Sequence, residues 1–441
     1  MGTALALWMF PALLVFVAIG IPIAFSLMSV ALIFGVLRFG DAAVFQFISK
    51  VDDVASNYIL GAIPLFVFMG ALLERSGIAS KLFDAIYLWT RRLPGGLAIG
   101  AVLMCTVFAA ATGITGATET VVGMLAIPAM MKYAYDKRLI SGTICAGGSL
   151  GTIIPPSITV VVLAPVADIP VGDLFAGIMF PGLIMSVLFI GYIIAVCFLN
   201  PALAPREEIR PEDEISLGQK LRITGVALLP PVFLIFAVLG TILLGWATPT
   251  EAAATGACGS ILLCFIYGQF NWTMLKEALY RTLSITAMIM LIVLGGSMFA
   301  GVFYASGGMV AIQKLLAEYG LAGWPAIGLI LLLTFLAGFV LELISIVLIV
   351  IPIAIPLVKL YGIDPLWFSV LFLVILQTSY LTPPMAPAIF YLRAIAPPSI
   401  TLMHMYKGVI PFIIMQVLTL CLVFLFPELA TWLPKQIYGL K

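Results

Sequence analysis

The sequence predicts an all-α polytopic membrane protein in which two similar halves each carry a re-entrant helical hairpin. Of its 441 residues, 63% are hydrophobic and 9% are charged, and the mean hydropathy is +1.22. Too few polar residues are present to cover a soluble domain of this size, so water cannot be the main solvent. Apolar runs of membrane-spanning length recur along the chain, as at 174–199, 223–244 and 408–426, which indicates a helical bundle in lipid.

The one long polar segment is residues 200–222, which we interpret as a cytoplasmic loop joining two membrane halves. Net charge is +1, which argues against a nucleic-acid partner. The first apolar run, 4–37, has no charged segment before it, so we expect a structural helix rather than a signal peptide. Six scattered cysteines and the single His404 offer no metal-ligand spacing and no histidine-based catalytic site.

Internal similarity is the strongest organisational signal. The segment around Thr112-Gly113-Ile114-Thr115-Gly116 and the segment around Gly338-Phe339-Val340-Leu341-Glu342 each lie in the middle of an apolar hairpin. Each is followed by Ile-Pro and then by an apolar span broken at a double proline, Pro155-Pro156 or Pro383-Pro384. We therefore expect ten crossings and two re-entrant hairpins.

The predicted organisation has six parts. They are N-terminal scaffold helices at 1–57, a first inverted repeat at 58–199 with its hairpin near 95–134, the loop at 200–222, linking scaffold helices at 223–283, a second inverted repeat at 284–426 with its hairpin near 324–358, and a C-terminal tail at 427–441. Short amphipathic stretches at 80–93 and 309–319 precede the two hairpins and are predicted to be interfacial arm helices.

The placement of basic residues gives an independent orientation. If both termini are periplasmic, fifteen of the twenty-one Lys and Arg residues fall on the cytoplasmic side, as the positive-inside rule requires. The first hairpin then enters from the cytoplasm and the second from the opposite side. Inverted repeats with broken helices are typical of alternating-access transporters.

Irregular backbone at membrane depth is tolerated only where it lines a protein-buried or watery cavity, so the hairpin tips and the proline breaks are the candidate sites. Carbonyls at helix C-termini together with hydroxyls suit a monovalent cation, whereas helix N-termini attract a carboxylate. The predicted sodium ligands lie at the two tips and the two breaks: Thr112, Gly113, Thr115, Gly116, Gly151, Thr152 and Pro155 in the first half, and Gly338, Thr378, Ser379, Thr382 and Pro383 in the second. Thr115 and Thr382 are expected at pseudo-symmetric positions. Close helix packing is the alternative role for the small residues.

The remaining polar residues of these segments are predicted to contact the substrate: Thr118, Glu119, Ser157, Glu342, Ser345 and Arg393. An acid at membrane depth costs about 2.5 to 3.5 kcal/mol even on the mild insertion scale, so Glu119 and Glu342 need a partner or a role. Capping of unwound backbone is one such role and proton coupling is another. Arg393 can bind a carboxylate or extend to the membrane interface.

These motifs resemble the large membrane subunit of tripartite ATP-independent periplasmic (TRAP) transporters, the DctM or SiaM type. The resemblance covers nearly the whole chain and rests on Ile63-Pro64-Leu65-Phe66, Gly113-Ile114-Thr115-Gly116-Ala117, Ile153-Ile154-Pro155-Pro156-Ser157 and Leu381-Thr382-Pro383-Pro384. It implies an elevator-type transporter of the inner membrane, with sodium as coupling ion and no other cofactor. It also implies a small four-helix membrane subunit and a periplasmic substrate-binding protein that delivers a small organic anion such as a dicarboxylate, 2-oxo acid or sugar acid.

Three other classes of protein compete with this interpretation. An enzyme is not expected, since the sequence has no HExxH, DDxxD or serine–histidine pairing. The inverted halves argue against a channel. A stand-alone sodium/carboxylate symporter of similar elevator architecture remains the alternative function.

Overall fold

The computed structural model describes residues 2–205, 215–383 and 386–439. Over these ranges the chain forms helices and no strand, which confirms the predicted fold class. Seven helices in the described ranges are long and apolar enough to span a membrane. Residues 206–214 of the predicted loop and Pro384 of the second double proline lie outside the described residues.

The helices of the first half are α1 (Gly2–Leu7), α2 (Met9–Ala18), α3 (Ile23–Phe39), α4 (Ala42–Ala55), η1 (Tyr58–Gly61), α5 (Ala62–Arg75), α6 (Ile78–Thr90), α7 (Gly96–Thr112), α8 (Thr115–Lys132), α9 (Lys137–Ser149), η2 (Leu150–Thr152), α10 (Ile158–Ala167), α11 (Val171–Leu199) and η3 (Pro201–Leu203). After the polar loop come α12 (Leu217–Ile235), a π-helical turn η5 (Phe236–Gly240), α13 (Thr241–Leu243) and α14 (Pro249–Ile266).

The remaining helices are α15 (Trp272–Ala305), α16 (Gly308–Glu318), α17 (Trp324–Ala337), α18 (Leu343–Leu360), α19 (Pro365–Leu381), α20 (Pro387–Ile395), α21 (Leu402–Leu425) and α22 (Glu428–Tyr438). They repeat the earlier order. A span (α5 or α15) leads to a short arm (α6 or α16), a helical hairpin, a broken helix pair (α9 and α10, or α19 and α20) and a closing span (α11 or α21). We call α7 with α8 hairpin 1, and α17 with α18 hairpin 2.

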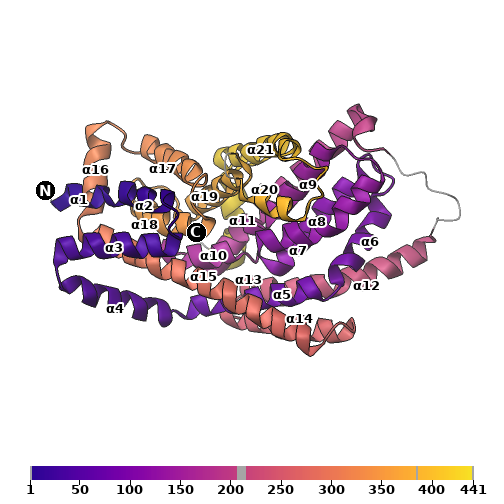
Figure 1. Ribbon diagram of the computed structural model, residues 1–441, viewed down its shortest axis with the longest axis horizontal. Coiled ribbons are helices and arrows are strands. Elements are labelled where there is room, and N and C mark those ends of the chain that lie inside the picture. Colours follow the sequence, from indigo (N-terminus) through magenta and orange to yellow (C-terminus); the bar gives the residue numbers. More distant parts are fainter. Residues whose placement is uncertain (1, 206–214, 384–385, 440–441) are drawn as a thin grey trace.

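The helices form two layers (Figure 1). The scaffold layer contains α3, α4, α5, α12, α14 and α15, with α15 packed on α3, α4 and α5 and α14 packed on α5. The hairpin layer contains the two hairpins, the broken pairs, α11 and α21, with α9 packed on α21 and α8, and α10 packed on α18. The main contact between the layers is made by α15 and α18.

Local sequence explains where the hairpins turn. Gly113 ends α7 with φ = 65°, a left-handed conformation that favours glycine. In hairpin 2 the side chain of Glu342 accepts hydrogen bonds from the backbone N–H groups of Ile344 and Ser345 at 3.0 and 3.4 Å, so it caps the start of α18. The acid at this tip therefore begins the returning helix.

Some of the free cysteines are buried and others are exposed. Cys105, Cys145, Cys197 and Cys264 are buried, as expected for small core residues, whereas Cys258 and Cys421 are exposed.

Candidate functional site

The tip of hairpin 1 lies against the break between α9 and α10. The N–H of Ile158 donates to the Gly113 carbonyl at 3.5 Å. A Cβ atom built on Gly151 would lie 3.0 Å from the Thr115 backbone nitrogen, so the two segments are in contact through their backbones. The structure thus brings together the first-half residues that the sequence placed in one cluster.

The C-termini of α7 and α9 and the N-termini of α8 and α10 converge here. Free carbonyls end the first pair of helices and free N–H groups begin the second pair. Such a point can hold a cation and, next to it, an anion.

Hydroxyl groups at this first cluster donate their protons to backbone carbonyls. Thr152 Oγ1 donates to Ser149 O at 2.9 Å, and Ser157 Oγ donates to Thr152 O at 2.8 Å. Because each proton is committed to a carbonyl, lone pairs on the hydroxyl oxygens remain for a cation. Thr112 Oγ1 and Thr118 Oγ1 also lie 3.0 Å from backbone carbonyls, those of Phe108 and Ile114, and 3.2 Å from each other.

The tip of hairpin 2 meets the end of α19 through the side chain of Ser379. A side chain on Gly338 would collide with Ser379, so only glycine allows this approach. Three hydroxyls at this end donate back into the helix: Thr378 Oγ1 to Val374 O at 2.8 Å, Ser379 Oγ to Leu376 O at 2.7 Å, and Thr382 Oγ1 to Thr378 O at 2.7 Å. Their oxygens again keep lone pairs for a cation.

The half-helices after the breaks cross to the opposite hairpin. α20 packs on α8 of hairpin 1, and α10 packs on α18 of hairpin 2. Gly116 lies against the ring of Tyr391 on α20, where even a Cβ atom would approach ring carbon Cε1 to 2.7 Å. Tyr391, half-exposed beside the first tip, is a candidate site residue that sequence analysis missed.

The two acids have different surroundings. Glu342 is exposed at the second tip and is occupied as a helix cap. Glu119 is fully buried, packs on Gly148 and lies beside Cys145, and neither carboxylate oxygen has a geometrically acceptable hydrogen-bond partner within the described ranges. The capping role expected for both acids is therefore observed for Glu342 alone.

Two of the predicted positions differ from the expected arrangement. Thr115 is the first residue of α8, in a hairpin, whereas Thr382 follows the last residue of α19, at a helix break. They occupy different elements of the repeat, so the expected pseudo-symmetry is wrong: the helix that matches α8 begins at Leu343.

Arg393 donates to the Ile400 carbonyl at 3.2 Å, on the connection beyond α20.

Sequence analysis also missed a buried polar cluster behind the first break. The side-chain amides of Gln377 and Gln416 both donate to Ser149 Oγ, at 3.1 and 3.3 Å. All three residues are fully buried and come from α19, α21 and α9. This cluster ties the end of α9 to the two helices behind it.

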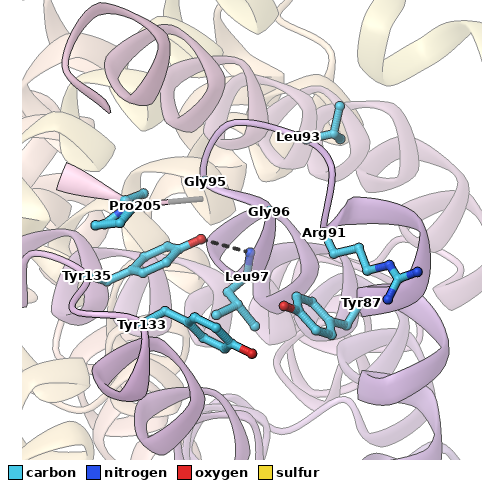
Figure 2. Close-up of a pocket in the computed structure, with 10 residues that line it drawn as sticks. Tyr87, Arg91, Leu93, Gly95, Gly96, Leu97, Tyr133, Tyr135 and Pro205 are labelled. Carbon is cyan, nitrogen blue, oxygen red and sulfur yellow. Dashed lines mark hydrogen bonds between the residues drawn. The ribbon is translucent and has the colours of Figure 1, made fainter. Parts of the chain in front are cut away.

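The cavity at the base of hairpin 1 gives no second candidate site. It is lined by Tyr87, Arg91, Leu93, Gly95, Gly96, Leu97, Tyr133, Tyr135, Ala204 and Pro205 (Figure 2). It encloses only about 10 Å³, room for one water, and the Tyr135 hydroxyl there accepts the Leu97 N–H at 3.3 Å. The cavity lies beside the start of α7 and is too small for an organic anion.

Comparisons with known proteins agree with this architecture. The family model of the tripartite ATP-independent periplasmic transporter DctM component matches residues 10–429. The chain is 32% identical over 403 residues to the C4-dicarboxylate TRAP transporter large permease protein DctM of Pseudomonas aeruginosa, covering 91% of this chain and 92% of that protein. It is 29% identical over 432 residues to the sialic acid TRAP transporter large permease protein SiaM of Vibrio cholerae, covering 95% and 96%.

Among solved structures, the YdaH transporter of Alcanivorax borkumensis has a TM-score of 0.55 with 16% identity, over 97% of this chain and 98% of that one. At this identity the likeness concerns the fold alone. It supports the predicted inverted-repeat transporter fold.

Proposed function

This chain belongs to the DctM family of TRAP transporter components, a family of permease subunits rather than enzymes, and on that premise we propose that it imports a small organic anion in a sodium-coupled cycle. The observation that carries the sodium proposal is the set of hydroxyls at both helix breaks, whose protons are donated to backbone carbonyls. Sodium ligands would be Thr152 and its neighbours at the first tip, and Ser379 and Thr382 with their neighbours at the second.

The substrate proposed is a carboxylate, such as a dicarboxylate, 2-oxo acid or sugar acid. The relatives named for C4-dicarboxylates and for sialic acid both handle acids. Helix N-termini at the two tips supply positive partial charge for such an anion. Tyr391 and Thr115 would border it at the first tip, and Glu342 at the second.

Movement of the hairpin layer against the scaffold layer is the proposed transport step. Each tip packs on a broken helix of its own layer, so both candidate ion sites belong to one body. A small membrane subunit and a periplasmic binding protein are the proposed partners, with both termini of this chain on the periplasmic side.

The decisive experiment is uptake into proteoliposomes that contain the chain and its candidate partners. Candidate carboxylates are supplied outside under an imposed sodium gradient, and sodium is then replaced by potassium. We expect uptake to stop on replacement, and uptake that continues unchanged in potassium would overturn sodium coupling.

A further inference from the structure

α18 contains a backbone carbonyl that its own helix cannot satisfy. In an α-helix the carbonyl of residue i accepts the N–H of residue i+4. The residue four positions after Pro352 is Pro356, which has no N–H. The Pro352 carbonyl therefore needs a donor from elsewhere, because an unpaired polar group is expensive inside a membrane.

Tyr304 supplies that donor. Its hydroxyl lies near the end of α15 and donates to the Pro352 carbonyl. α15 belongs to the scaffold layer and α18 to hairpin 2, so this hydrogen bond joins the two layers at their main contact.

The described residues contain at least two more carbonyls of the same kind, and both are capped inside one layer. Val226, four residues before Pro230, accepts from the Tyr267 hydroxyl at 3.0 Å, between α12 and the end of α14 in the scaffold. Val423, in the last turn of α21 and four residues before Pro427, accepts from Trp367 Nε1 at 2.9 Å, between α21 and α19 in the hairpin layer. Of these three hydrogen bonds, only the one from Tyr304 to the Pro352 carbonyl joins the two layers.

The surroundings of Tyr304 leave room for α18 to shift. Gly296 lets α18 approach α15 closely, since a Cβ atom there would lie 2.6 Å from Leu348 Cβ. The small side chains Ser297, Ala300 and Gly301 continue along the same face of α15 and line a cavity of about 230 Å³ that Tyr304 and Pro352 also border. The contact between α15 and α18 therefore has an open cavity directly beside the hydrogen bond.

We infer that Tyr304 is a positioning residue for transport: its bond to the Pro352 carbonyl holds hairpin 2 in the position seen here, and the bond must break when the hairpin layer moves. This inference rests on the layer movement proposed above. Breaking the bond leaves the Pro352 carbonyl without a donor, so the position seen here is favoured over any position in which the two helices have separated.

Substitution of either partner tests this. Tyr304→Phe removes the donor and leaves the carbonyl unpaired in both positions, so the preference disappears. Pro356→Ala gives α18 an N–H for the Pro352 carbonyl, so separation no longer leaves that carbonyl unpaired. Both single variants should move the equilibrium in the same direction, by about fivefold or more, and the double variant should add little to either.

The equilibrium between the two positions of the hairpin layer can be followed by pulsed electron paramagnetic resonance on the full chain in lipid nanodiscs. Spin labels are placed at Tyr58→Cys at the start of η1 and Leu360→Cys at the end of α18, both exposed, with Cys258 and Cys421 replaced by Ser. The population at the distance seen in the structure is expected to fall in Tyr304→Phe and in Pro356→Ala. Thermal unfolding is recorded in parallel, where Pro356→Ala should restore the stability lost in Tyr304→Phe.

Tyr267→Phe and Trp367→Phe are the matched controls, since each deletes an aromatic donor to a proline-freed carbonyl within one layer. They should lower the unfolding temperature and leave the distance populations unchanged. If Tyr304→Phe behaves as these controls do, or if the two single effects simply add, the inference is overturned. If the native chain with sodium and substrate shows no second distance at all, the proposed layer movement itself fails.

Discussion

Gly113 lies directly against the carbonyl oxygen of Pro156, so the tip of hairpin 1 and the break between α9 and α10 meet backbone to backbone. A methyl group at residue 113 would collide with that carbonyl. The residue also has φ = 65°, where a Cβ atom is strained. Two independent constraints therefore require glycine at this point of the candidate site.

Gly113→Ala is predicted to abolish most sodium-dependent uptake, because the tip must withdraw from the break and separate the proposed ligands. Gly362→Ala is the matched control: its φ is 67°, but nothing lies within 4 Å of the added atom. The control measures backbone strain alone, about 1 kcal/mol. Uptake and thermal unfolding are measured for both variants, and equal losses of uptake would show that the contact with Pro156 is unimportant.

The Gln377, Gln416 and Ser149 cluster gives a stability prediction. Ser149→Ala removes the oxygen that accepts from both amides, leaving buried N–H groups unpaired, so we expect a loss of about 1 to 3 kcal/mol. Thr143→Val on the same helix is the control, because the buried Thr143 hydroxyl has no hydrogen-bond partner among the residues described. That control should be neutral or stabilising in thermal unfolding. An equal effect of both substitutions would contradict the role given to the cluster.

The chain alone is predicted to transport poorly, since the proposed cycle delegates substrate capture to a periplasmic binding protein and part of the membrane body to a small subunit. Proteoliposomes with this chain alone, with the small subunit, and with both partners are compared for initial uptake rate. Full-rate uptake by the chain alone would favour the stand-alone symporter.

The sequence predicted the hairpins and breaks well because glycine and proline act locally: Gly113 ends a helix by its own φ, and Pro155 cannot continue one. Contacts between distant elements carried no such signal. Gln377 and Ser149 are 228 residues apart, and Tyr391 meets Gly116 only because α20 crosses to hairpin 1. The spacing of the prolines does identify the Pro352 carbonyl as one that its own helix cannot satisfy. It does not identify Tyr304 as the donor.

The equivalence expected of Thr115 and Thr382 failed for a related reason. It compared residue types at the two clusters, whereas the repeat relates helix starts to helix starts, and α8 matches α18 rather than the break after α19. The two threonines still lie at the two candidate sites, one at each.

Thr115→Val and Thr382→Val are predicted to weaken sodium binding while leaving the fold intact. Valine keeps the shape of threonine and deletes the hydroxyl, and the loss of one buried ligand oxygen costs about 1 to 3 kcal/mol, or roughly five- to a hundredfold in affinity. Sodium half-saturation of uptake should rise accordingly. Since coupling between ion and substrate is reciprocal, substrate binding should weaken at low sodium and recover at high sodium.

Thr419→Val is the control, because its hydroxyl, like that of Thr382, donates back into its own helix, to Met415 O at 3.0 Å, on α21 away from both breaks. It should leave the sodium dependence of uptake unchanged. Recovery at high sodium separates a lost ion ligand from general damage, which sodium cannot reverse. If the Thr115 and Thr382 variants match Thr419→Val at every sodium concentration, these hydroxyls serve packing, and the sodium ligands lie among the other oxygens of the two breaks.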